Sequence, residues 1–206
     1  PDAPGGGGMM SQALATPSLT LDDAEALEEV VGVSMVTAYN ENFVDLHAGD
    51  ESKTTLIDGS TTGWLETLGY EMEYGQFFTD RNVTRRDNVI VLGSEVAIDL
   101  FGSSSAALNE EVKLKGKTFT VVGVMATKGG AMMGFSMDAI SVVPITTYQT
   151  KLYAQRTPQG DDAVQAIALV MEDINDKSFI IADVEHILRQ RHRIEPGEND
   201  DFSIIT

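Results

Sequence analysis

The pattern of apolar and polar positions predicts a mixed chain of helices and strands. Apolar residues at helical spacing are expected to form helices at residues 20–31, 61–69, 94–101, 146–154 and 174–194. Alternating or continuous apolar runs predict strands at residues 33–40, 53–61, 88–93, 110–114, 117–126, 139–145, 163–172 and 201–205. The predicted fold class is therefore α+β.

Particular side chains mark the ends and buried faces of the first and last helices. In the first helix Thr20 is placed to cap the N-terminus, and the buried stripe is expected to contain Ala24, Leu27 and Val31. In the last helix the buried stripe is expected to contain Phe179, Ile180, Val184, Ile187 and Leu188. The single tryptophan, Trp64, shares a helix face with Leu68, which favours core packing over ligand stacking.

The order of the elements predicts two subdomains. With an additional strand before Pro1, the outer segments would become two βαβ-like halves that could form one mixed sheet, and residues 70–159 would be an insertion with its own sheet. The first subdomain would then be discontinuous, built from residues 1–69 and 160–206.

Charge and composition exclude several classes of function. The 206 residues contain 14 Lys and Arg against 32 Asp and Glu, a formal charge of −18, so nucleic acid and anionic membrane surfaces are repelled. There is no cysteine, which rules out disulfides, a thiol nucleophile and thiolate metal sites. No apolar run approaches the roughly 20 residues that span a bilayer. The basic residues Arg189, Arg191, His192 and Arg193 end the last predicted helix, where cations complement the helix dipole.

No residue pattern predicts catalysis or a cofactor. The glycines at residues 5–8 lack the strand, helix and lysine that a phosphate-binding loop needs, and they indicate a linker. The three histidines do not assemble a nucleophilic triad with a serine or threonine. Paired acids such as Glu71 and Glu73 are expected by chance in so acidic a chain. A weak surface cation site could form at Glu198, Asp200 and Asp201.

Methionines gather in a glycine-rich stretch near the middle of the chain. Met125, Met132, Met133 and Met137 lie in or beside it. Flexible thioethers suit an adaptable apolar contact surface, but the loop could equally fold its methionines back over the sheet. Copper binding through the thioethers is a third, remote alternative.

Several stretches in series resemble the MacB-like periplasmic core domain of ABC transporter permeases, the macrolide-exporter type within the FtsX-like group. They are GQFFTDRNV, NVIVLGSEVAIDLFG, VKLKGKTFTVVGVMATKGG, ISVVPITTYQTKLY and LRQRHRIEPGENDDFSI. Their order and spacing carry the resemblance, which covers nearly the whole chain. One departure is that the strand expected before the glycines at residues 5–8 is absent, so the sheet of the first subdomain is expected to lack an edge strand.

The resemblance implies a non-catalytic domain on the extracytoplasmic face of the membrane, held between two transmembrane helices outside this sequence. Residues 1–69 and 160–206 would form a porter-like subdomain, and residues 70–159 an inserted Sabre-like subdomain. The implied partners are a second permease copy, an ATPase domain or subunit and a periplasmic adaptor, and no cofactor is implied. Candidate partner contacts are Lys128, Met132, Met133, Phe135 and Met137.

Two alternatives stay open at this point. A lipoprotein-handling or cell-division permease of the same group would carry a related domain, and fold alone does not separate it from an exporter. A secreted acidic hydrolase that uses carboxylates such as Glu71 and Glu73 is the alternative from another class.

Overall fold

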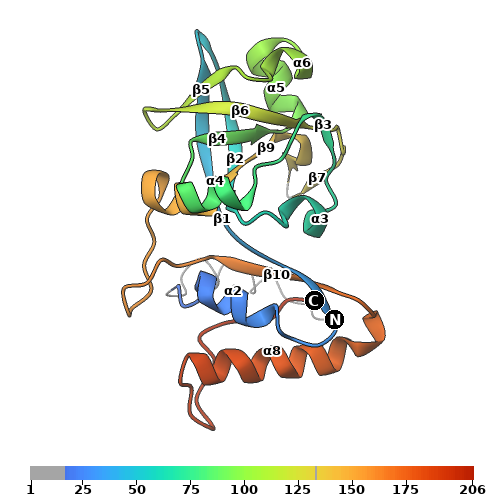
Figure 1. Cartoon of the computed structure of the whole chain (residues 1–206), viewed down its shortest axis with the longest axis vertical. Coiled ribbons are helices and arrows are strands. Elements are labelled where there is room, and N and C mark those ends of the chain that lie inside the picture. Colours follow the sequence, from blue (N-terminus) through green and yellow to red (C-terminus); the bar gives the residue numbers. More distant parts are fainter. Residues whose placement is uncertain (1–16, 133) are drawn as a thin grey trace, which may run out of the picture.

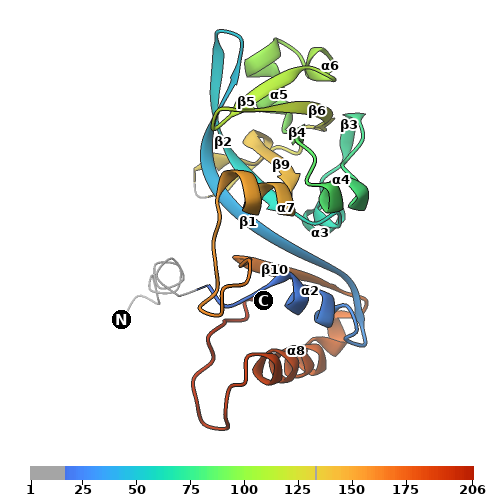
Figure 2. The same cartoon turned by 60° about the vertical axis from the view of Figure 1, so that its left-hand side comes forward.

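The computed structural model of the protein describes residues 17–132 and 134–206. These residues form two bodies that share one long strand, β1 (Val33–Ala48), as Figures 1 and 2 show. We call the upper one the barrel body and the lower one the helical layer. The first half of β1 belongs to the helical layer, and its second half belongs to the barrel body.

The strands of the barrel body close into a ring. Going round from β1, the hydrogen-bonded order is β2 (Glu51–Ser60), β9 (Ile140–Pro144), β4 (Val89–Leu92), β6 (Lys117–Met125) and β5 (Glu111–Leu114). The ring closes because β5 pairs with β1 through Leu46 and Leu114. A further strand, β3 (Met72–Gly75), pairs with β6 outside the ring. Closure leaves β1 paired on both sides at Leu46 and His47.

Short helices surround this ring. They are α3 (Trp64–Leu68), α4 (Asp80–Arg85), α5 (Ser94–Phe101), α6 (Ser104–Ala107) and α7 (Ile145–Thr147), which continues into a π-helical turn, Tyr148–Leu152. The core that they cover includes the fully buried Phe119 and the 1% exposed Tyr148. At Gly59 a Cβ atom would lie 2.2 Å from the Cβ of Tyr148, so only glycine allows this helical turn to approach β2.

A second apolar cluster lies around Trp64. This side chain is fully buried, and its ring stacks on Tyr70 with centroids 4.7 Å apart. Its Nε1 donates to Oδ2 of Asp58 at 2.8 Å. The expected core role of Trp64 is confirmed.

The helical layer consists of two strands and two helices. The first half of β1 pairs antiparallel with β10 (Ala166–Met171), and α2 (Leu21–Leu27) and α8 (Lys177–Arg191) pack beside this ribbon (Figure 1). A 3-10 turn, Ile174–Asp176, leads into α8. Thr20 caps α2 as expected, because its hydroxyl accepts from the backbone nitrogen of Asp23 at 3.2 Å.

Two predicted stripe residues point to solvent instead. Val31 is 88% exposed and Val30 is buried, because α2 ends at Leu27 and the helical period does not continue to Val31. Phe179 is 75% exposed, whereas Ile180, Val184 and Leu188 form the buried row. These three are spaced four residues apart, and Phe179 lies one residue, about 100°, off that row.

Three further expectations differ from the structure. Residues 201–205 form no strand, although Phe202 packs on the cluster between α2 and α8. No helix was predicted between residues 69 and 94, but this stretch contains α4, which begins with a capping box between Thr79 and Asn82. Residues 70–159 do not form a separate sheet, because β4, β5, β6 and β9 are continuous with β1 and β2.

Candidate functional site

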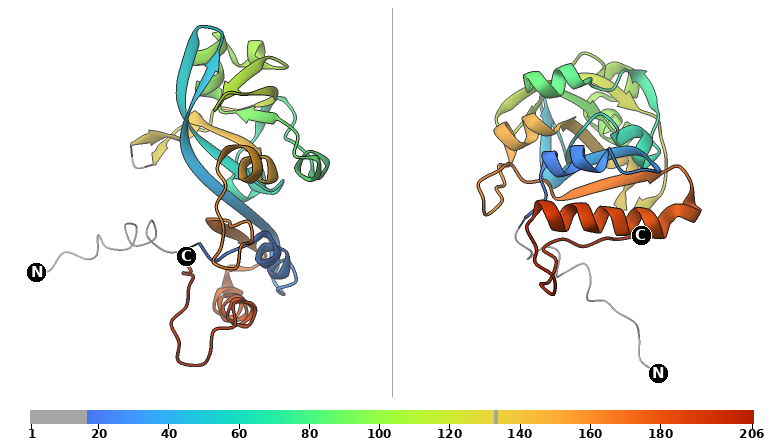
Figure 3. Two further views of the ribbon diagram at one scale, coloured as in Figure 1. Left: turned by 90° about the vertical axis from the view of Figure 1, so that its left-hand side faces the viewer. Right: turned by 60° about the horizontal axis from the view of Figure 1, so that its bottom comes forward.

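The glycine-rich stretch forms a hairpin that projects from the barrel body. Its strands are β7 (Ala131–Met132) and β8 (Phe135–Ser136), followed by a 3-10 turn, Met137–Ala139, that leads directly into β9. In the left view of Figure 3 the hairpin stands away from the sheet at mid-height. Because it follows the end of β6 and precedes β9, both of its ends are fixed on the barrel.

A carboxylate fastens the base of this hairpin. The side chain of Asp138 accepts from the backbone nitrogens of Lys128, at 2.7 Å, and of Gly129, at 3.0 Å. The hydroxyl of Thr127 donates to that of Ser94 at the start of α5, at 3.1 Å. The two strands of the excursion are thus tied together at the surface of the barrel.

Tyr70 lies under the same base and joins it to the tryptophan cluster. Its hydroxyl donates to the carbonyl of Met137 at 3.0 Å, and the Nζ of Lys128 lies 4.2 Å above its ring. The Nζ of Lys128 also donates to the carbonyl of Leu68. Burial, together with the charges of Asp58 and Asp138, raises the pKa of Tyr70 to about 12, so its hydroxyl keeps the proton that it donates.

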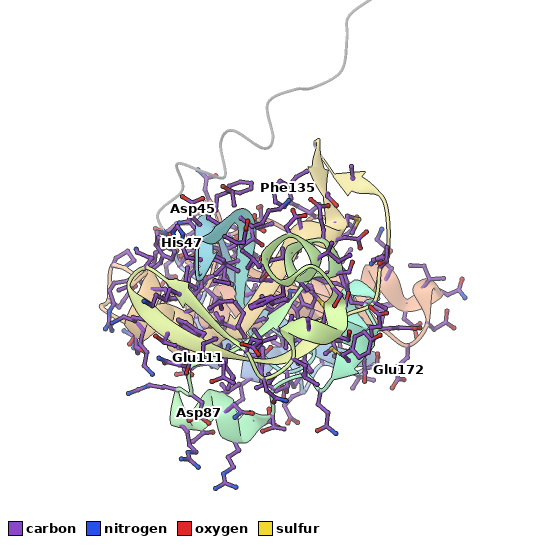
Figure 4. The ribbon with its side chains drawn as sticks, turned by 90° about the horizontal axis from the view of Figure 1, so that it is seen from above. Asp45, His47, Asp87, Glu111, Phe135 and Glu172 are labelled. Carbon is purple, nitrogen blue, oxygen red and sulfur yellow. The ribbon has the colours of Figure 1, made fainter. Side chains whose placement is uncertain are left out.

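An aromatic pair fixes the outer strand of the hairpin. The ring of Phe135 meets that of Phe43 in β1 edge to face, with centroids 5.1 Å apart. Phe43 is 55% exposed, and Figure 4 shows Phe135 on the same side of the molecule as Asp45, two residues further along β1. The exposed face of β1 and the hairpin therefore make one surface.

Four of the five predicted contact residues lie within the part of the chain that the structure describes. Lys128 and Phe135 hold the base, and Met137 packs beside Trp64 in the second cluster. Met132 lies in β7, and Met133 lies outside the described residues. Met125 is 1% exposed, so two of the four methionines fold back over the sheet.

Phe43, Tyr70 and Asp138 belong to this surface but were missed from the sequence. Only Phe43 carried a signal, because it stands at a position of β1 where the alternation predicts an outward side chain. The contacts of Tyr70 and Asp138 depend on the folded path of the chain.

Two adjoining cavities lie between α2 and the loop that precedes α3. Their volumes are about 300 and about 320 Å³, and they share Glu28, Val36, Thr62 and Gly63. The first is also lined by Asp22, Glu25 and Asp80, so its walls are acidic. These cavities mark the junction of the two bodies.

The other residues considered for metal binding or catalysis form no such site in the part of the chain that the structure describes. Among the described residues no group of three or more His, Asp or Glu side chains could hold a metal ion. Glu71 and Glu73 are both exposed, and neither lines the two cavities. Asp200 and Asp201 face Arg189 and His192, so the expected cation site there is occupied by the chain's own basic groups.

Comparison with known proteins assigns the domain. The family model of the MacB-like periplasmic core domain matches residues 3–180. The chain belongs to this family. It is also 31% identical, over 93% of its length, to the macrolide export ATP-binding/permease protein MacB of Hyphomonas neptunium, and 26% identical, over 88%, to the pyoverdine export protein PvdT of Pseudomonas entomophila. The chain spans 29% and 26% of these two relatives, less than a third of each.

Solved structures agree with this fold. The periplasmic region of MacB from Actinobacillus actinomycetemcomitans aligns with a TM-score of 0.71 at 18% identity, covering 86% of this chain and 76% of that one. The extracellular domain of the ABC-type transporter YknZ from Gram-positive bacteria aligns with a TM-score of 0.69 at 18% identity, covering 93% and 92%. At this identity the likeness shows the fold alone.

Membership of the MacB-like family makes the chain a periplasmic domain of an ABC transporter permease and places it on the extracytoplasmic side. This family assignment takes the place of the alternative that the chain is a secreted acidic hydrolase. No helix among residues 17–132 and 134–206 is long and apolar enough to cross a membrane.

Proposed function

We propose that this domain couples cytoplasmic ATP hydrolysis to export by contacting a partner protein through the β7–β8 hairpin. In this proposal the domain is itself non-catalytic and is anchored by flanking transmembrane helices. A separate or fused ATPase and a second permease copy complete the transporter. The observation that carries the proposal is a hairpin whose base is fastened and whose two strands stand away from the barrel body.

The shape of the hairpin supports a contact role. Its base is held by Asp138, Tyr70 and the Phe43–Phe135 pair, so its two strands are held in one orientation. A surface that is ordered before binding loses less conformational entropy when a partner docks. Met132 in β7, together with Met133, would then meet a periplasmic adaptor, where flexible thioethers adapt to a partner's apolar surface.

The proposed subdomains do not coincide with the two bodies, because β2 and α3 belong to the first proposed subdomain but lie in the barrel body. We place the porter-like subdomain at residues 1–69 and 160–206 and the Sabre-like subdomain at residues 70–159. The hairpin falls in the inserted part, and α2, β10 and α8 fall in the discontinuous part. Export is favoured over lipoprotein handling or cell division because the relatives named above are a macrolide and a pyoverdine export protein.

The test is a pull-down with the full-length permease. Changing Met132 and Met133 together to Ser should weaken capture of the adaptor about tenfold and leave the domain folded. The matched control is Ile98→Ser, which removes a 49% exposed apolar side chain from α5 and should leave capture unchanged. Equal capture by the methionine variant and the parent would remove the hairpin as the contact. ATP turnover by the purified domain would contradict its non-catalytic role.

A further inference from the structure

The basic end of α8 lies against the start of α2 and against the last residues of the chain. After α8 the chain turns at residues 193–198 and comes back beside α2, as Figure 2 shows. Three separate segments therefore meet at one place in the helical layer. The side chains that join them carry charges of both signs.

Asp23 is the centre of this meeting point. Its side chain is 4% exposed, and its Oδ1 accepts from the Nε of Arg191 at 2.6 Å. Its Oδ2 accepts from the hydroxyl of Thr20 at 2.7 Å and lies 3.3 Å from the Nε2 of His192. Burial alone would raise the pKa of Asp23. The hydrogen bonds from Arg191 and Thr20 and the charge of His192 outweigh burial and hold this pKa below its ordinary value.

His192 stands between two carboxylates. Its Nε2 faces Asp23 from α2, and its Nδ1 lies 2.7 Å from Oδ1 of Asp201 in the C-terminal segment. Its side chain is 8% exposed, so water does not replace these partners freely. A neutral imidazole has one N–H and one lone pair, and only the imidazolium can donate to both carboxylates.

Other contacts hold the same segment without depending on a proton of His192. Arg189 donates to Asp200 and, at 2.9 Å, to the carbonyl of Glu195. The hydroxyl of Ser18 donates to the carbonyl of Asp201 at 2.9 Å. The ring of Phe202 meets that of His192 edge to face, with centroids 5.9 Å apart.

The charges at this point balance only when His192 is protonated. Asp23 and Asp201 then face the cations Arg191 and His192. When the imidazole loses its proton, one ring nitrogen presents a lone pair to a carboxylate oxygen. The attraction between this nitrogen and the carboxylate then becomes a repulsion.

We propose that His192 is a proton-dependent latch that fastens the C-terminal segment, residues 200–206, to the start of α2. Protonation closes the latch by bridging Asp23 and Asp201, and deprotonation opens it. The contacts of Arg189 then hold the nearer turn, and the bond from Ser18 and the packing of Phe202 still restrain the segment without the two charged contacts of His192. If the domain is anchored as proposed above, the latch decides whether the segment beyond α8 moves with the helical layer; the latch itself does not depend on that anchoring.

The latch is tested by measuring the distance between α2 and the C-terminal segment. The chain has no cysteine, so spin labels can be attached at two introduced sites, Glu25→Cys on α2 and Ile205→Cys, both exposed positions. Pulsed electron resonance then reports the distance distribution in the purified 206-residue chain. Between about pH 6 and about pH 8.5 the released fraction, seen as a broad long-distance component, should rise about tenfold.

Three variants test whether His192 and its contact with Asp201 cause the pH response of the released fraction. His192→Gln should show a released fraction that does not change with pH. Asp201→Asn should lose most of the pH response, because an amide can donate to a neutral imidazole nitrogen; Asp201 is 48% exposed, so this change leaves the core intact. Arg193→Gln removes a neighbouring cation outside the network and should respond as the parent does.

Two results overturn the latch. One is a distance distribution in the parent that stays the same over this pH range. The other is an equal pH response in His192→Gln and the parent, since the titrating group would then lie elsewhere. Circular dichroism of each variant at both pH values separates opening of the latch from unfolding. No partner protein enters the experiment, so its outcome is independent of the adaptor pull-down.

Discussion

The barrel body and the helical layer use the same strand, β1, in opposite ways. In the barrel body β1 is one member of a closed ring, with β2 on one side and β5 on the other. In the helical layer it is half of a two-stranded ribbon, in which β10 pairs with no second strand among the described residues. A ribbon of two strands is marginally stable without helices packed on it. The barrel is therefore held by its own closure, and the layer by α2, α8 and the charges that join them.

The largest effect is expected from a cavity in the barrel. Phe119 is fully buried inside the ring, and Phe119→Ala should lower the free energy of unfolding by about 3 to 5 kcal/mol. Urea unfolding followed by circular dichroism measures this change. The matched control is Phe43→Ala on the exposed face of β1, with an expected loss of about 1 kcal/mol or less. Similar losses for both variants would mean that the interior of the ring does not dominate stability.

The second prediction concerns Asp58, a carboxyl buried under Trp64. It is 3% exposed, and its Oδ1 has no hydrogen-bond partner. Its pKa is raised to about 7, mainly by burial. The hydrogen bond from Trp64 lowers this pKa, and the charge of Glu41 raises it. The folded pKa lies above the unfolded value, so the stability from protonated Asp58 is complete below about pH 4 and is lost as the pH rises through about 7.

Asp58→Asn should remove this pH dependence. The amide oxygen still accepts from Trp64, but the side chain cannot ionise. Raising the pKa of Asp58 by about 3 corresponds to about 4 kcal/mol. The free energy of unfolding of the variant, relative to that of the parent, should therefore increase by up to that amount between about pH 4 and about pH 8. Urea unfolding at both pH values measures the difference. Asp50→Asn, in the exposed turn between β1 and β2, is the control and should keep the parent's pH dependence.

Much of the barrel was predictable from the sequence because its signals are local. The helix at residues 94–101 and the hairpin of β5 and β6 match their apolar pattern. Closure of the ring was not predictable, since Leu46 and Leu114 meet across a long stretch of chain. The basic end of α8 was predictable as a cationic helix end, but its partner Asp23 lies 168 residues away from Arg191. At residues 127–138 the sequence indicated a glycine-rich loop, but neither its β7–β8 hairpin nor the fastening by Asp138 and Tyr70 was predictable.

The third prediction tests whether the helical layer unfolds apart from the barrel. Ile180 is 2% exposed between α8 and the end of α2, and Ile180→Ala should cost about 2 to 4 kcal/mol. Hydrogen exchange should speed up in α2 and α8 and stay unchanged in β4 and β6. Ile174→Ala, at a 68% exposed position, is the matched control. An equal loss of protection in the ring strands would show that the two bodies form one cooperative unit.

The smallest expected effects come from two capping boxes, one in each body. In α2 the Oδ2 of Asp23 accepts from the backbone nitrogen and the hydroxyl of Thr20, at 2.8 and 2.7 Å. In α4 the Oδ1 of Asn82 accepts from the same two groups of Thr79, both at 2.9 Å. The two capping boxes therefore have the same local hydrogen-bond geometry. Asp23, however, is charged and buried under Arg191 and His192, whereas Thr79 and its contacts with Asn82 are exposed.

Removing each hydroxyl therefore compares the two bodies with the same chemical change. Thr20→Ala should cost about 1 to 2 kcal/mol, because it also removes a donor from a buried carboxylate, and Thr79→Ala about 0.5 kcal/mol. Thermal unfolding at neutral pH, with Thr→Ser at each site as the control, measures both. The difference between the costs of Thr20→Ala and Thr79→Ala should be smaller when both are measured in a protein that also carries Arg191→Gln. In that protein Asp23 has lost its main cation whether or not Thr20 is present. A cost at Thr20 no greater than that at Thr79 would mean that the charge network adds nothing to the cap, and that the helical layer depends on apolar packing alone.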